Sequence, residues 1–218
     1  MRWLAGNWGE VWTLLASHLA LAAPAIALSF LISIPIGWLA HRYHGARWWL
    51  VTLSGLIYAI PSLPLLVALP TLLGTQVRDD ANVVAALTLY GIALMVRSVA
   101  DALDDVPPGP VISAQAMGFS PAAQFLRVQL PLAGPSLLAG LRVVTVSTVA
   151  LVTVSAVLGT PSLGQLFTDG FQRGIMAEVA TGLVGTAVLA LGLDGLLLAV
   201  GRLLMPWTGV HRNAGGRA

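Results

Sequence analysis

The chain has 218 residues, of which 57% are hydrophobic and 9% are charged, and its mean hydropathy is +0.85. Soluble domains carry about 25% charged residues, so the composition predicts an integral membrane protein. The sequence contains neither cysteine nor lysine, which excludes disulfides, thiolate metal sites and a lysine-bearing P-loop, and the net charge of +2 gives no indication of nucleic-acid binding.

The N-terminal segment, 1–18, contains Trp3, Trp8 and Trp12 and is expected to lie along the outer membrane interface, as an aromatic belt does. The next stretch, 19–40, has 22 residues without a charge and would be about 33 Å long as a helix, enough to cross a bilayer. Four further apolar stretches of similar length are 50–73, 81–100, 136–158 and 177–203. Since none shows the alternation of a barrel strand, the predicted fold class is an all-α membrane protein with about five transmembrane helices.

The arginine residues predict the orientation of these spans. With five crossings, the loop after the first span, the central loop 101–135 and the tail 206–218 share one face, which carries eight arginines against three on the other. The positive-inside rule therefore puts the central loop and the C-terminus in the cytoplasm and the N-terminus outside. The eight are Arg42, Arg47, Arg97, Arg127, Arg142, Arg202, Arg212 and Arg217, and the three are Arg2, Arg78 and Arg173.

The second span is interrupted by Pro61, Pro64 and Pro70. Each proline removes a backbone donor, and broken helices in transporters tend to line the transport pathway. Pro61 and the polar Ser62 are therefore candidates for a position on a pathway. A kink that neighbouring helices tolerate is the alternative.

The central loop 101–135 contains two short helix signals separated by a Gly-Phe-Ser-Pro turn. Gly118 permits the tight turn, Pro121 begins the second helix, and Leu130-Pro131 is expected to end it. The apolar residues that would be costly to leave in water are Met117, Phe119, Phe125 and Leu126. They could fill a partner's groove, so we interpret the loop as a docking element. A loop that packs on its own bundle is the alternative.

The fourth span, 136–158, is rich in hydroxyl side chains. Thr148 and Ser155 lie seven residues apart on one helix face and are candidates for the lining of a polar gate. Alternatively, these hydroxyls bond back to their own helix or join it to a neighbour.

Asp194 is the only carboxylate well inside a predicted span. An ionisable group in the membrane is a functional hypothesis by default, but we favour a structural ion pair with an arginine such as Arg97 or Arg202. Four glycines of this span are expected to pack closely against another helix: Gly182, Gly185, Gly192 and Gly195. The four histidines do not suggest a metal site, and no catalytic residues are predicted.

The central loop resembles the cytoplasmic signature of type I ABC importer permeases, E-A-A-x3-G-x9-I-x-L-P. The matching positions are Ile112, Ser113, Ala114, Gly118, Val128, Leu130 and Pro131. The spacing from Gly118 to Leu130-Pro131 is kept, while Ile112 replaces the signature glutamate and Ser113 the first alanine. In this family the two short helices dock into a groove on the nucleotide-binding subunit. The resemblance thus implies that ATP and Mg²⁺ are bound by a partner and that this chain holds no cofactor.

Two further stretches narrow the resemblance. Residues 58–66, YAIPSLPLL, resemble the T-I-P-S-L-A-L-L segment of permeases for glycine betaine, choline and related osmoprotectants, and residues 158–164 resemble their G-A-G-G-L-G loop. Asp194, followed by Arg202 and Pro206, also fits the last helix of these permeases.

The resemblance implies a permease subunit that imports an osmoprotectant across the cell membrane. Its partners would be an ABC ATPase subunit, an external solute-binding protein and a second permease copy or sister permease. A permease for methionine or another amino acid is the alternative within the family. From other classes, the alternatives are a self-contained carrier and a small membrane-embedded lipid enzyme that uses Asp101, Asp104 and Asp105.

Overall fold

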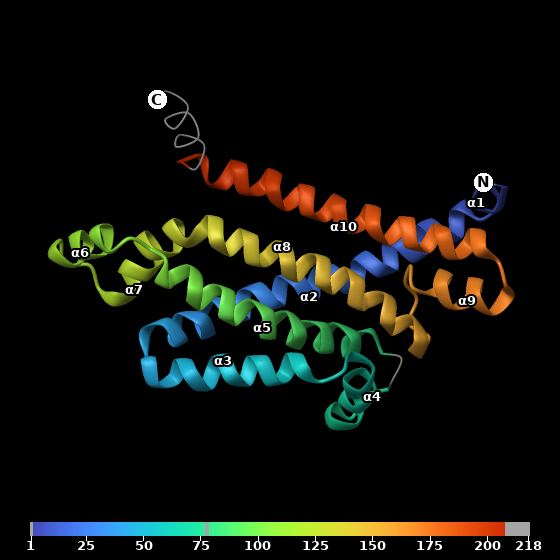
Figure 1. The fold of residues 1–218 in the computed structure, drawn as a ribbon, viewed down its shortest axis with the longest axis horizontal. Helices are drawn as coiled ribbons and strands as arrows, with labels where there is room; N and C mark the ends of the chain where they lie inside the picture. Colours follow the sequence, from blue (N-terminus) through green and yellow to red (C-terminus); the bar gives the residue numbers. More distant parts are fainter. Residues whose placement is uncertain (1, 77–78, 208–218) are drawn as a thin grey trace.

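The computed structural model describes residues 2–76 and 79–207, and its regular structure over those ranges is entirely helical. Four long helices run along the long axis of the molecule (Figure 1): α2 (Trp8–Arg42), α5 (Asp80–Asp104), α8 (Leu130–Ser155) and α10 (Met176–Leu204). Each is long and apolar enough to cross a membrane, and α3 (His44–Ala59) with α4 (Ser62–Leu73) forms a fifth unit that is bent. The predicted all-α membrane fold is confirmed.

The shorter elements lie at the two ends of this bundle (Figure 1). They are α1 (Arg2–Gly6), α6 (Pro108–Ala116), α7 (Pro121–Gln124), the π-helical turn η1 (Phe125–Gln129), the 3-10 turn η2 (Ala156–Leu158) and α9 (Gln165–Arg173). Helices α6 and α7 lie at one end of the long axis, whereas α1 and α9 lie at the other end.

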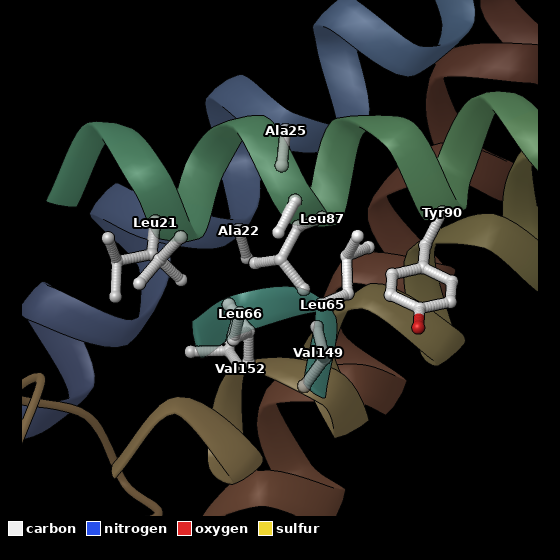
Figure 2. Close-up of a cluster of buried hydrophobic side chains, with 11 residues drawn as sticks. Leu21, Ala22, Ala25, Leu65, Leu66, Leu87, Tyr90, Val149 and Val152 are labelled. Carbon is white, nitrogen blue, oxygen red and sulfur yellow. The ribbon is translucent and has the colours of Figure 1, made fainter. Parts of the chain in front are cut away.

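Helix α5 is the most buried of the long helices and packs against α2, α3 and α8. A hydrophobic cluster joins α5 to α2, α4 and α8, and Figure 2 shows side chains from all four helices converging. Its labelled members are Leu21, Ala22, Ala25, Leu65, Leu66, Leu87, Tyr90, Val149 and Val152. This cluster packs α4, the second helix of the bent α3–α4 unit, against α2, α5 and α8.

Glycines permit the close approach of α2 and α5. A Cβ atom added at Gly91 would lie 2.0 Å from Ser29 Oγ, and one added at Gly37 would lie 2.5 Å from Val99 Cβ. Ser29 Oγ lies 2.6 Å from the Ala25 carbonyl oxygen in its own helix and 3.1 Å from the Thr88 carbonyl oxygen of α5. Small side chains at such a contact allow backbones to approach closely in a membrane.

The second span is not one straight helix over 50–73. Helix α3 already begins at His44, and α3 and α4 meet at an angle of 104°. The break falls at Ile60, which has extended backbone angles because the ring of Pro61 disfavours a helical residue before it. The break leaves backbone carbonyl groups without a partner in their own helix. One of them, the Ile60 carbonyl oxygen, accepts a hydrogen bond from the Tyr90 hydroxyl of α5.

The other two prolines of this span do not break it. Pro64 lies in the first turn of α4, where a backbone donor has no partner within the helix in any case. Pro70 lies inside α4, which ends at Leu73 before Gly74 with its left-handed φ of +69°. Only one of the three prolines therefore redirects the chain.

The predicted boundary at residue 18 is absent from the structure. Helix α2 begins at Trp8 and contains 35 residues, so it is about 52 Å long. Trp8 and Trp12 are exposed, as an interfacial segment requires, but His18 is fully buried and its Nε2 donates to the Val149 carbonyl oxygen at 3.1 Å. Helix α2 thus continues through residue 18 without a break, and the position of residues 1–18 along the outer interface stays a prediction.

Candidate functional site

The central loop is a compact pair of short helices. Helix α5 ends at Asp104, α6 follows from Pro108, and the chain reverses at Gly118, whose φ is +80°. Ser120 then caps α7, its hydroxyl accepting from the Ala123 N–H at 3.3 Å, and Pro121 occupies the first helical position. Figure 1 shows α6 farther out along the long axis than the adjacent ends of α3 and α10.

Side chains hold the two short helices together and against the bundle. Gln124 Nε2 donates to the Val111 carbonyl oxygen at 2.9 Å and so joins α7 to α6. Phe125 is buried, and its ring centroid lies 5.3 Å from that of Trp38 on α2. The loop is therefore a fixed platform rather than a flexible linker.

Leu130-Pro131 does not end the second short helix, contrary to the sequence prediction. The π-helical turn η1 connects α7 directly to α8, and the Leu130 N–H donates to the Phe125 carbonyl oxygen five residues earlier. In a regular α-helix the ring of Pro131 would clash with the Arg127 carbonyl group. The wider π turn accommodates the proline without breaking the helix.

The residues of the signature differ in exposure. Ile112 and Met117 are 61% and 69% exposed, and Leu126 in η1 is 59% exposed. Ser113, Gly118 and Pro121 are exposed, Phe119, Val128, Leu130 and Pro131 are half-buried, and Ala114 is buried. The loop thus presents apolar side chains on a rigid frame, and four of the seven signature positions are buried or half-buried in that frame: Ala114, Val128, Leu130 and Pro131.

A cluster of ion pairs lies where the loop joins the bundle. Arg47 of α3 pairs with Asp104 and, at 2.9 Å, with Asp101, while His41 Nδ1 lies 2.5 Å from Asp104 Oδ1. Arg97 adds a longer contact of 3.6 Å to Asp101. Sequence reasoning missed this cluster, whose signal was two aspartates three residues apart on one face of α5. Both aspartates pair with basic side chains of the bundle. They therefore have a structural role rather than the catalytic role considered for a lipid enzyme.

The sequence profile of one transport family matches most of the chain. The family is described as binding-protein-dependent transport system inner membrane component, and the match covers residues 33–208. The chain belongs to this family of permeases.

Individual permeases and a solved structure agree with this assignment. The osmoprotectant import permease protein OsmW of Salmonella typhimurium is 29% identical over 213 residues, covering 94% of this chain and 97% of the relative. The choline transport system permease protein OpuBB of Bacillus subtilis is 26% identical and covers 94% of both chains. An inward-facing structure of the MetNI methionine ABC transporter has a TM-score of 0.80 at 21% identity, covering 91% of this chain and 98% of that chain, which shows a shared fold.

Three of the four pathway candidates of the permease lie on α4 and α8, and Pro61 directly precedes α4. Pro61 is exposed at the break before α4 and Ser62 is half-buried, whereas Thr148 and Ser155 of α8 are buried. Ser155 Oγ donates to the Val152 carbonyl oxygen of its own helix at 2.8 Å, which is the alternative that the sequence left open. Helices α4 and α8 meet in the hydrophobic cluster of Figure 2, which contains none of the four candidates, so their position on a pathway stays a prediction.

Asp194 forms an ion pair between α10 and α8, but its partner is Arg142. The guanidinium Nε lies 2.6 Å from Asp194 Oδ1 and Nη2 lies 2.8 Å from Oδ2, a bidentate geometry. The predicted partners, Arg97 and Arg202, were wrong, because Arg97 is exposed and contacts Asp101 instead. The pair lies along a groove of about 600 Å³ between the two helices, which Ser147 also lines.

The glycines of α10 divide into two groups. A Cβ atom at Gly182 would lie 3.0 Å from Leu166 Cβ, and one at Gly185 would meet Leu163 at 3.7 Å. At Gly192 and Gly195 nothing lies within 4 Å. The predicted close packing is therefore right at Gly182 and Gly185, whereas Gly192 and Gly195 meet no neighbour among the described residues.

The opposite end of the permease contains a buried carboxylate that sequence reasoning missed. Glu178 in the first turn of α10 is fully buried, and Arg173 Nη2 lies 2.6 Å from its Oε1 atom. Arg173 also lies 3.9 Å from Asp169. The signal was present in the sequence, since Arg173 and Glu178 flank the Gly-Ile turn that joins α9 to α10.

Proposed function

We propose that this chain is the membrane-spanning subunit of an ATP-driven importer, and that α6 and α7 form its contact with the ATPase. The observation that carries the proposal is the rigid helix pair at one end of the bundle, with Ile112, Met117 and Leu126 exposed on it. Its sequence also resembles the signature of type I ABC importer permeases from Ile112 to Pro131.

The proposed assembly follows from this contact. The ATPase subunit binds ATP and Mg²⁺, an external solute-binding protein delivers the solute, and a second permease copy or a sister permease completes the pathway. The excess of arginine on the face of the central loop supports a cytoplasmic loop and C-terminus and an external N-terminus. Of the arginines in that tally, Arg78, Arg212 and Arg217 lie outside the described residues.

The solute is a small osmoprotectant such as glycine betaine or choline. This assignment is supported by the similarity to OsmW and OpuBB, which are named as osmoprotectant and choline permeases, and by the resemblance of residues 58–66 to permeases of that branch. The MetNI structure has 21% identity and supports the fold, so methionine is the comparison solute rather than a second assignment.

Transport into vesicles tests the assignment. Vesicles that contain the permease with its ATPase and its solute-binding protein should accumulate radiolabelled choline or glycine betaine only when ATP is present on the ATPase side. Methionine should neither accumulate nor compete. Accumulation of methionine alone would contradict the substrate, and solute flux by the permease without the ATPase would identify a self-contained carrier instead.

Gly118→Ala should weaken the coupling of ATP hydrolysis to solute delivery. An alanine in the left-handed conformation at φ +80° costs about 1–2 kcal/mol, so the turn between α6 and α7 would shift away from its present geometry. The measurement is the solute-stimulated rate of ATP hydrolysis in vesicles, which should fall severalfold while the amount of folded permease changes little.

Gly118→Asn is the matched control. Asparagine also adds a side chain at this position, where a Cβ atom would have nothing within 4 Å, but it adopts the left-handed conformation more readily than alanine does. This variant should couple more like the wild type. Equal losses in the two variants would show that any side chain at the turn is harmful, whatever its backbone preference.

A further inference from the structure

The loop that contains α6 and α7 is almost free of charge. Between Val106 and Leu130 the only ionisable side chain is that of Arg127. Arg127 is exposed, and none of the ion pairs among the described residues involves it. The loop therefore offers a partner one cation and no carboxylate.

The exposed apolar side chains of the loop are held in place. Ile112, Met117 and Leu126 are each more than half exposed. The helices that carry them are held together by the hydrogen bond from the Gln124 side chain to the Val111 carbonyl oxygen. Exposed apolar groups on a rigid frame favour a partner that removes them from water.

The position of the loop favours a protein over lipid as this partner. Helix α6 lies farther out along the long axis than the adjacent end of α3 (Figure 1). From that end Arg47 pairs with Asp101 and Asp104, and His41 also pairs with Asp104. These four side chains are partly exposed and their charges require water, so they mark the edge of the hydrocarbon region. Helix α6 is on the aqueous side of that edge, where an ATPase subunit can reach it.

We propose that the ATPase groove for this loop is apolar where it meets Ile112 and provides a carboxylate for Arg127. This inference rests on the proposed function. In the signature of related permeases a glutamate occupies the position of Ile112, so this permease should reject an ATPase whose groove holds an unpaired cation there. Leaving such a charge buried without its partner is costly, which makes the position a determinant of partner choice.

Binding of the purified permease in nanodiscs to its own ATPase subunit tests the proposal. Ile112→Glu should weaken binding at least about tenfold, and Ile112→Gln should weaken it less, because an uncharged amide is cheaper to bury than a carboxylate. Arg127→Gln should weaken binding severalfold at about 50 mM salt and hardly at about 500 mM, since salt screens a charge pair at the rim of an interface. His44→Glu adds the same charge at the same end of the bundle but outside the loop, and should leave binding unchanged.

A change of partner separates a loss of specificity from a loss of folding. The second ATPase comes from a system whose permease has the signature glutamate. The Ile112→Glu variant should bind that ATPase more tightly than the wild-type permease binds it. Undiminished binding of Ile112→Glu to its own ATPase would overturn the apolar groove, and an unchanged salt dependence for Arg127→Gln would overturn the carboxylate. If the wild-type permease binds no ATPase at all, the proposed function itself fails.

Discussion

Replacing Asp194 with asparagine is expected to abolish most solute transport and to lower the melting temperature of the permease. The substitution leaves Arg142 charged in the groove between α8 and α10 without the bidentate partner that it has now, and an unpaired charge in the membrane is costly. Helices α8 and α10 would also lose their strongest polar contact. The measurements are ATP-dependent uptake in vesicles and thermal unfolding in detergent.

The reversed pair separates this contact from a role of either side chain alone. The double variant Arg142→Asp with Asp194→Arg should recover much of the stability that each single variant loses, because the two charges again meet. Arg97→Gln is the control, since it removes an exposed contact of 3.6 Å that is worth little. If the double variant regains stability but no transport, the carboxylate at position 194 has a further role in the groove between the helices.

Gly91→Ala is expected to destabilise the permease by about 1–3 kcal/mol, the usual cost of overpacking a well-packed contact. The added Cβ atom would lie 2.0 Å from Ser29 Oγ and 2.6 Å from Ser29 Cβ, so α2 and α5 would have to separate. Because these two helices form the most extensive contact of the bundle, the shift would spread through the core. Reversible unfolding in mixed micelles measures the loss.

Gly55→Ala provides the comparison for this substitution. Gly55 lies in the exposed face of α3, where a Cβ atom would meet nothing within 4 Å. Alanine is the better helix former by about 1 kcal/mol, so this variant should be as stable as the wild type or slightly more stable. A Gly91→Ala protein of wild-type stability would show that the α2–α5 contact adjusts at no cost.

The sequence was sufficient for the fold class because a backbone in lipid has few options. A stretch such as 19–40 must be helical once it is apolar and of membrane length. The loop between α5 and α8 was also readable, since the turn at Gly118 and the helix start at Pro121 follow from the backbone preferences of those two residues.

Other features depend on contacts that a sequence does not display. Nothing local distinguishes Pro61 from Pro70, and the break at Pro61 is accompanied by Tyr90 of another helix, which bonds the Ile60 carbonyl group. The partner of Asp194 is 52 positions away in the chain, so only the packing of α8 against α10 identifies Arg142. Arg97 and Arg202 were wrong as partners because the sequence does not show which helix packs beside Asp194.

The π turn before α8 has a mechanical consequence. Because Pro131 does not interrupt the chain, helical turns continue from Pro121 to Leu158, 38 residues or about 57 Å. The helical path ends at Gly159, whose φ is +84°. A tilt of α7 would therefore reach the end of the bundle near α9 through unbroken helical turns, with bending confined to the two places that favour it, the π turn and Pro135.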